Sequence, residues 1–207
     1  EIKKTGSIPG IWLAPSAIFE RWPKLNQYHD ALQKLPNGRY AVSFCNWGWS
    51  DNKNWYWGDT TGKTYFLDPD HPKSIKLMTE ILKQVKLQGW KYYKFDFTYA
   101  LSTARNAYDK KKTRFQTLSD LFTLFRTELG NDVMINACIG EPGRYALGKA
   151  DVARMGGDMG NNWSSIRNNL SELFLRMSTN GYWWQGDPDV FNMVKENSEL
   201  NDEEKNL

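Results

Sequence analysis

"PKSIKLMTEILKQVKLQGWKYYKFDF", residues 72–97, joins a helical pattern directly to a strand pattern. Pro72 suits the first turn of a helix. Apolar residues then recur at helical spacing, at Ile75, Met78, Leu82 and Val85. Gly89 ends this pattern, and the aromatic run after it is typical of a strand. A helix that leads straight into an apolar strand indicates an α/β protein with a parallel sheet.

The same alternation continues on both sides of this stretch. Further strand patterns lie at residues 8–15, 39–47, 132–139, 150–158 and 181–191. Residues 111–129 predict a second helix with an apolar stripe at Phe115, Leu118, Phe122 and Phe125. Residues 162–179 predict a third, capped by Asn161 or Asn162, with its stripe at Ile166, Leu170, Phe174 and Met177. The chain therefore contains five or six strand–helix units.

Polar residues gather where these strands end. They are Asp96, Cys138, Arg154, Asp158, Asp187 and Asp189. A (β/α)8 TIM barrel keeps its active site at the carboxyl ends of its strands, so this placement favours a barrel over an open sheet. A barrel needs eight units in roughly 250 residues. We therefore expect one barrel segment over residues 1–207 that lacks some strands, with residues 194–207 frayed or beginning a further helix.

Composition excludes several classes of protein. The 207 residues are 40% hydrophobic and 25% charged, with a net charge of +3, as in an ordinary soluble domain. Lys110–Lys112 suits a solvated turn better than a nucleic-acid patch, and no apolar stretch reaches transmembrane length or forms a signal peptide. We expect neither a nucleic acid nor a membrane as partner. Two cysteines, Cys45 and Cys138, cannot define a disulfide scaffold, and they leave the compartment open.

The aromatic content is high, with 10 Trp, 10 Tyr and 10 Phe. Many of these residues crowd two polar, glycine-containing stretches, residues 45–59 and 180–191. Aromatic rings beside Asp and Asn are typical of sugar-binding surfaces, although such rings also anchor long loops. Candidate stacking platforms are Trp47, Trp49 and Trp57.

Two carboxylates have the arrangement that a glycosidase needs. Asp96 and Asp158 each follow a strand, and a glycosidase places two carboxylates across the scissile bond. Lys94 lies on the same strand face as Asp96, where its charge would favour the ionised carboxylate. Gly156 and Gly157 precede Asp158 and would leave room for substrate. The alternative is that both acids only cap the helices that follow them.

Five segments resemble the melibiase group, glycoside hydrolase family 36 with its relative family 27. They are "PGIWLAP" (9–15), "YFLDPDHPKSIKLM" (65–78), "YYKFDF" (92–97), "DVARMGGD" (151–158) and "WWQGDPDVF" (183–191), in the family's order. The resemblance implies barrel strands three to seven, with Asp96 as nucleophile and Asp158 as acid/base. It also implies a retaining, exo-acting α-glycosidase without a cofactor, with α-galactosidase favoured. Expected substrate-binding residues are Lys94, Arg154, Cys138, Asp187, Trp12 and Trp47.

The sequence also departs from this family. The strand with its sugar-binding Asp-Asp pair has no counterpart, and the loop "CIGEPGR" (138–144) adds Glu141 near the expected pocket. These departures leave N-acetylgalactosamine, glucose and arabinopyranose open as alternative sugars. A non-catalytic carbohydrate-binding protein and a barrel enzyme for a non-sugar substrate are further alternatives, and oligomerisation is open.

Two other motifs offer competing assignments. "WYWGD" (55–59) would nominate Asp59 as the acid, but it precedes Asp96, whereas the similar family 27 segment follows the nucleophile. "LDPDHP" (67–72) offers Asp68, Asp70 and His71 as metal ligands, but its two prolines predict a turn into a helix with Asp70 near the N-cap. We expect no metal.

Overall fold

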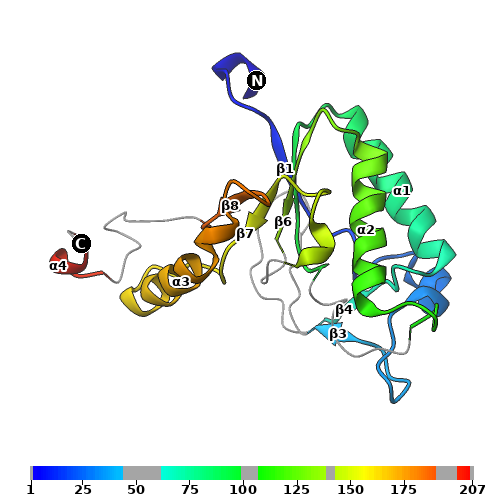
Figure 1. The fold of residues 1–207 in the computed structure, drawn as a ribbon. Coiled ribbons are helices and arrows are strands. Elements are labelled where there is room, and N and C mark those ends of the chain that lie inside the picture. Colours follow the sequence, from blue (N-terminus) through cyan, green and yellow to red (C-terminus); the bar gives the residue numbers. More distant parts are fainter. Residues whose placement is uncertain (1, 44–61, 99–106, 139–142, 190–199, 206–207) are drawn as a thin grey trace.

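The computed structural model describes residues 2–43, 62–98, 107–138, 143–189 and 200–205. Its centre is a five-stranded sheet with the order β1-β5-β6-β7-β8, in which every neighbouring pair is parallel (Figure 1). The strands are β1 (Gly10–Leu13), β5 (Tyr92–Phe95), β6 (Met134–Ala137), β7 (Val152–Arg154) and β8 (Gln185–Asp187). The prediction of an α/β protein with a parallel sheet is confirmed.

Three helices connect these strands. α1 (Pro72–Leu87) precedes β5, α2 (Arg114–Leu129) joins β5 to β6, and α3 (Trp163–Arg176) joins β7 to β8. Figure 1 shows α1 and α2 side by side along the sheet. Between β6 and β7 the described residues form only a 3-10 turn, η4 (Arg144–Ala146).

Local sequence explains where the helices begin and end. The side chains of His71, Thr113 and Asn162 accept hydrogen bonds from the first turns of α1, α2 and α3, so each helix has an N-cap. Gly89, after α1, has a φ of 82°, a left-handed conformation that favours glycine. The chain can therefore turn directly from α1 into β5.

A second, antiparallel sheet, whose first strand follows β1 in the chain, was not predicted. It has the order β2-β4-β3, with β2 (Ala17–Phe19), β4 (Thr64–Phe66) and β3 (Val42–Ser43), and is accompanied by the 3-10 helix η2 (Leu25–Ala31). The strand predicted at 39–47 belongs to this sheet and not to the parallel one. Residues 44–61, including Cys45, Trp47, Trp49, Trp57 and Asp59, lie outside the described part of the chain.

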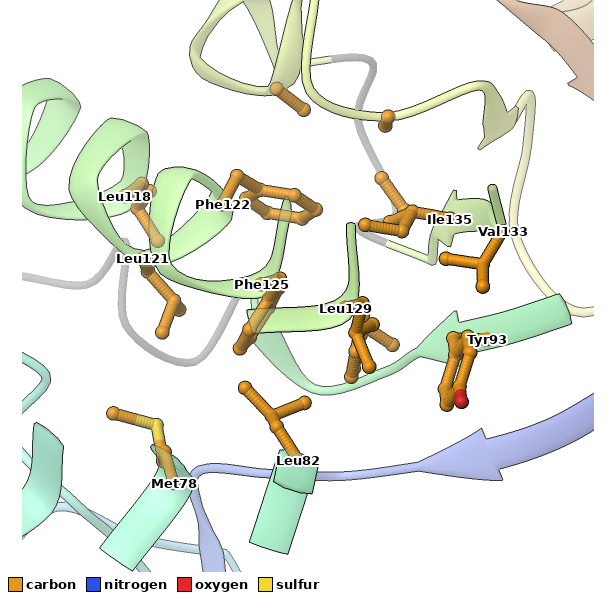
Figure 2. Close-up of a cluster of buried hydrophobic side chains, with 14 of the residues drawn as sticks. Met78, Leu82, Tyr93, Leu118, Leu121, Phe122, Phe125, Leu129, Val133 and Ile135 are labelled. Carbon is orange, nitrogen blue, oxygen red and sulfur yellow. The ribbon is translucent and has the colours of Figure 1, made fainter. Parts of the chain in front are cut away.

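The main core lies between the parallel sheet and helices α1 and α2 (Figure 2). Tyr93, Phe95 and Ile135 are completely buried on this side. They pack with side chains of the two helices, namely Met78, Leu82, Leu118, Leu121, Phe122, Phe125 and Leu129. Full burial of one such side chain stabilises a fold by about 1.5–3 kcal/mol. Because strand side chains alternate, residues 92, 94 and 136 project to the opposite face of the sheet.

Some predicted core residues are exposed instead. Ile75 and Phe115 lie outside the buried faces of α1 and α2. On α3 only Ile166 of the predicted stripe is buried, and Phe174 is 70% exposed. Leu170, Leu175 and Met177 are exposed as well. No described element covers this side of α3, and helical periodicity alone does not show whether a packing partner exists.

The described C-terminal residues contain one short helix, α4 (Asp202–Lys205). It lies within the segment predicted to fray or to begin a helix. Throughout the described ranges, no helix is both long and apolar enough to cross a membrane.

Candidate active site

The face of the parallel sheet opposite the helices carries polar side chains from all five strands. Trp12, Lys94 and Asn136 stand at the same level on β1, β5 and β6, and Arg154 is level with Asp187 on β7 and β8. Asp96 and Cys138 directly follow β5 and β6. Parallel strands end at one edge of a sheet, so this topology gathers the predicted site residues there. Trp47 is the exception, because it lies outside the described residues.

Asp96 is held by two hydrogen-bond donors. Its Oδ2 accepts from the indole Nε1 of Trp12 at 3.0 Å, and its Oδ1 accepts from the backbone N of Phe97 at 2.7 Å. Phe97 has a φ of 58°, a left-handed conformation that costs a non-glycine residue about 1–3 kcal/mol. Such strain is concentrated at functional sites. The carboxylate therefore has a fixed orientation at the end of β5.

Cys138 lies between the groups around Asp96 and those around Arg154. The pKa of its thiol is raised to about 12, mainly by burial and also by the charge of Asp96, while the charges of Lys94 and Arg154 oppose the rise. Arg154 Nη1 lies 3.5 Å from its Sγ. The thiol therefore stays protonated at neutral pH.

Arg154 is 2% exposed and contacts two carboxylates. Its Nη2 lies 2.6 Å from Asp189 Oδ2 and 2.9 Å from Asp158 Oδ1, and it also donates to the carbonyl oxygen of Gly157 at 3.0 Å. Burial alone would lower the pKa of Arg154, but the carboxylates of Asp189 and Asp158 raise it above its ordinary value. The guanidinium is therefore a permanent positive charge inside the site.

A second network joins the middle of the sheet. Asn136 Nδ2 lies 2.7 Å from the hydroxyl of Tyr92 and 2.7 Å from Asp187 Oδ2. Lys94 Nζ lies 3.8 Å from the same Asp187 oxygen. Burial raises the pKa of Tyr92, so its hydroxyl stays protonated and can donate or accept. The expectation that Lys94 favours the ionised form of Asp96 stays a prediction.

Sequence reasoning missed three features of this site, namely Tyr92, Asn136 and the partners of Asp189. Tyr92 precedes Lys94 by two residues, and Asn136 precedes Cys138 by two. Alternation along the strands could therefore have placed both on the polar face. No sequence pattern indicates that Asp189 shares Arg154 with Asp158.

The two glycines before Asp158 have different roles. A Cβ on Gly156 would lie 2.3 Å from Asn169 Oδ1, so Gly156 permits close packing of this loop against α3. A Cβ on Gly157 would meet nothing within 4 Å. Open space beside Asp158 therefore begins at Gly157, and the Asp158 side chain itself is 93% exposed.

The possible metal ligands of "LDPDHP" have other partners. His71 Nδ1 accepts from the backbone N of Lys73 at 3.2 Å and so caps α1. Asp70, just before that N-cap as predicted, accepts from Thr117 Oγ1 at 2.7 Å and pairs with Lys112 at 3.2 Å. Asp68 accepts from the backbone N of Tyr108 at 3.0 Å. Across the described ranges, no group of three or more His, Cys, Asp or Glu side chains is arranged to hold a metal ion.

This chain is similar in fold to solved glycoside hydrolases, while no protein-family model matches it. One is the α-galactosidase from Thermus thermophilus in complex with stachyose, with a TM-score of 0.75 and 21% identity over 99% of this chain and 43% of that one. Another is the glycoside hydrolase domain of PelA from Pseudomonas aeruginosa, with a TM-score of 0.53 and 14% identity over 86% and 66% of the two chains. A third is a family 31 sulfoquinovosidase from E. rectale, with a TM-score of 0.53 and 14% identity over 79% and 24%.

At these identities the likeness is one of fold. The chain spans about two fifths of the length of the Thermus α-galactosidase. The parallel sheet with helices on one side is thus an arrangement found within glycoside hydrolases.

Proposed function

We propose that this chain is the central part of the catalytic barrel of a retaining α-glycosidase, with β1 and β5 to β8 as barrel strands three to seven. One observation carries the proposal. Asp96 and Asp158 both lie at the carboxyl edge of the parallel sheet and are linked through Cys138 and Arg154. The fold shared with glycoside hydrolases supports it.

Hydrogen bonds between distant strands support a barrel wall. Asn136 on β6 and Asp187 on β8 lie 2.7 Å apart at their side-chain tips, although β7 runs between them. Two steps between strands cover about 10 Å in a flat sheet, which is more than these two short side chains span. Lys94 Nζ on β5 lies 3.8 Å from Asp187 Oδ2 on β8, although two strands run between β5 and β8. The sheet must therefore curl toward its polar face, as a barrel wall does.

The proposed reaction follows from the positions of the two carboxylates. Asp96 attacks the anomeric carbon and forms a glycosyl-enzyme, while Asp158 gives its proton to the departing glycosidic oxygen. Asp158 then takes a proton from water, which attacks the same carbon and releases the sugar with its configuration kept. Trp12 Nε1 and Phe97 N each hold one oxygen of Asp96, and each oxygen keeps a further lone pair that can attack the substrate. Retention predicts a separation of about 5–5.5 Å between the two carboxyl groups when substrate is bound.

We propose an α-galactoside or α-galactosyl oligosaccharide as substrate. The fold is shared with an α-galactosidase described in complexes with stachyose and with p-nitrophenyl α-D-galactopyranoside. It is shared also with a sulfoquinovosidase, so the fold alone does not select the sugar. Lys94, Asp187 and Arg154 supply the charges that would bind its hydroxyl groups.

The test is hydrolysis of a panel of aryl α-glycosides by the purified protein and by Asp96→Asn. We expect release from the α-galactoside, and a loss of more than about a thousandfold in Asp96→Asn. Asp132→Asn is the matched control, because Asp132 is an exposed carboxylate that pairs with Lys91. Unchanged activity in Asp96→Asn would refute the nucleophile. No release from any glycoside, with sugar still bound, would favour a non-catalytic carbohydrate-binding protein.

A further inference from the structure

Arg154 is shared by two carboxylates that differ sharply in exposure. The Asp189 side chain is 12% exposed and the Asp158 side chain is 93% exposed, yet both lie within 2.9 Å of the same guanidinium nitrogen. Arg154 itself is almost completely buried. One partner is therefore fixed inside the protein, and the other reaches the solvent side of the site.

Asp189 is held in place from several directions. Its Oδ2 accepts from the backbone N of Met159 at 2.8 Å, and its own backbone N donates to Asp187 Oδ1 at 2.9 Å. Its φ is 74°, a left-handed conformation that is uncommon for residues other than glycine. The surrounding contacts must hold this strained residue, so the carboxylate is preorganised beside Arg154.

A residue that alternates between acid and base changes its charge during each cycle. When Asp158 carries the proton, it no longer supplies a negative charge to Arg154. A buried guanidinium without a counter-charge is strongly unfavourable. If Asp158 were the only counter-charge, Arg154 would hold it in the ionised form, and proton donation would be suppressed.

We propose that Asp189 is a positioning residue that keeps Arg154 paired, so that Asp158 can gain and lose its proton. This inference rests on the proposed function. In the first step the proton moves from Asp158 to the glycosidic oxygen as the bond from that oxygen to the anomeric carbon breaks. In the second step Asp158 takes a proton from water as the water oxygen bonds to the anomeric carbon and the bond from that carbon to Asp96 breaks. Throughout both steps Asp189 remains the ion-pair partner of Arg154, and among the described residues the ionisable groups around Arg154 are Asp158, Asp189 and the thiol of Cys138.

A purely structural role for Asp189 is the competing explanation. Asp189 also ties the end of β8 to the loop after β7 through Met159. Loss of this hydrogen bond would lower the hydrolysis rate of all substrates alike. Loss of proton donation would lower kcat/KM, which reports the first step, only for those substrates whose leaving group needs a proton, so leaving-group dependence separates the two roles.

The experiment compares kcat/KM for the phenyl and 2,4-dinitrophenyl α-glycosides of the preferred sugar. We expect Asp189→Asn to lower kcat/KM for the phenyl glycoside at least tenfold more than for the dinitrophenyl glycoside, whose leaving group needs little protonation. Asp158→Asn should give the same pattern, and Asp132→Asn should leave both rates unchanged. An equal loss on both substrates, or no loss, in Asp189→Asn would overturn the inference.

Failure of this inference is distinguishable from failure of the proposed function. If Asp158→Asn shows no leaving-group dependence, the assignment of Asp158 as acid fails. If Asp158→Asn shows it and Asp189→Asn does not, only the role of Asp189 fails. Should Asp189→Asn not fold, the double variant Arg154→Gln/Asp189→Asn removes both members of the ion pair. The ratio of its kcat/KM on the phenyl glycoside to its kcat/KM on the dinitrophenyl glycoside should equal the same ratio for Arg154→Gln. A different ratio would overturn the inference.

Discussion

At the scale of single residues, the orientation of Asp96 depends on one indole group. The backbone donor, Phe97 N, is present whatever side chains surround it, whereas the donor to Oδ2 comes from Trp12 on the neighbouring strand. The geometry of the proposed nucleophile therefore rests on a single side chain that can be changed without removing the aromatic ring.

Trp12→Phe keeps an aromatic ring but removes the N–H donor to Asp96. A hydrogen bond to a charged group contributes about 1.5–3 kcal/mol, so we expect kcat to fall by about ten- to a hundredfold. Steady-state kinetics on the preferred aryl glycoside measure this change. Trp90→Phe is the control, because Trp90 Nε1 donates only to Gln88 at 2.8 Å, away from the site. An unchanged kcat in Trp12→Phe would show that this hydrogen bond does not orient the nucleophile.

Cys138 gives a prediction about alkaline pH. An unfolded thiol ionises near its ordinary pKa of 9.0, whereas burial holds the folded thiol protonated up to about 12. The stabilisation from this thiol is therefore complete below pH 9 and is lost as the pH rises toward 12. In the folded protein, iodoacetamide should label the Cys138 peptide far more slowly at pH 9 than it does in urea, as mass spectrometry would show. Equal labelling rates would mean that the thiol is not buried as described.

At the scale of helices and strands, local patterns predicted some features and missed others. The spacing in residues 72–97 located α1 and β5, because a proline, a helical stripe and a glycine act within a few residues. Burial of Ile75, Phe115 and Phe174 was predicted wrongly, because burial depends on neighbours that are distant in sequence. The antiparallel sheet was missed as well. Its strands β2 and β4 have only three residues each, and their pairing joins segments that are distant in sequence.

In the candidate site, too, some features could be predicted from the sequence and others could not. Positions at strand ends could be predicted, because parallel strands place their carboxyl ends together. The pairings of Arg154 with Asp189 and of Asn136 with Asp187 could not, because they depend on the curvature of the sheet and on the left-handed backbone at Asp189.

The start of α2 provides a test at this scale. Thr113 and Gln116 form a capping box, in which Thr113 Oγ1 accepts from Gln116 N at 3.2 Å and Gln116 Oε1 accepts from Thr113 N at 2.8 Å. We expect Thr113→Ala to lower the free energy of unfolding by about 0.5–2 kcal/mol in urea titrations. Thr123→Ala, which removes a hydroxyl inside the same helix, should cost less. Equal costs would show that the cap is not what stabilises α2.

At the scale of the whole molecule, both outer strands of the parallel sheet lie beside uncovered apolar surface. An apolar groove of about 400 Å³ next to β1 is lined by residues that include Leu13, Ile18, Leu77 and Ile81. Beyond β8, α3 exposes Phe174 and Leu175, the latter to 82%. A closed barrel would cover both surfaces with the neighbouring helices, as the proposed barrel segment requires.

These surfaces predict how the 207-residue chain behaves alone. Exposed apolar patches promote association, so we expect sedimentation velocity to show concentration-dependent oligomers. Phe174→Gln/Leu175→Gln should shift the chain toward monomer. Leu87→Gln, which changes an isolated exposed leucine at the end of α1, should not. A chain that is monomeric at every concentration tested would contradict the description of α3 as an uncovered apolar face.

Azide rescue of Asp96→Gly is the most direct test of whether Asp96 is the nucleophile. Removing the Asp96 side chain leaves space for azide on the face of the sugar that Asp96 would attack, opposite the leaving group. We predict that activity on the dinitrophenyl α-glycoside is lost without azide and returns with it. The product should then be the β-glycosyl azide, identified by NMR. Hydrolysis by Asp96→Gly without azide, or an α-configured azide as product, would contradict the assignment of Asp96 as the nucleophile of a retaining α-glycosidase.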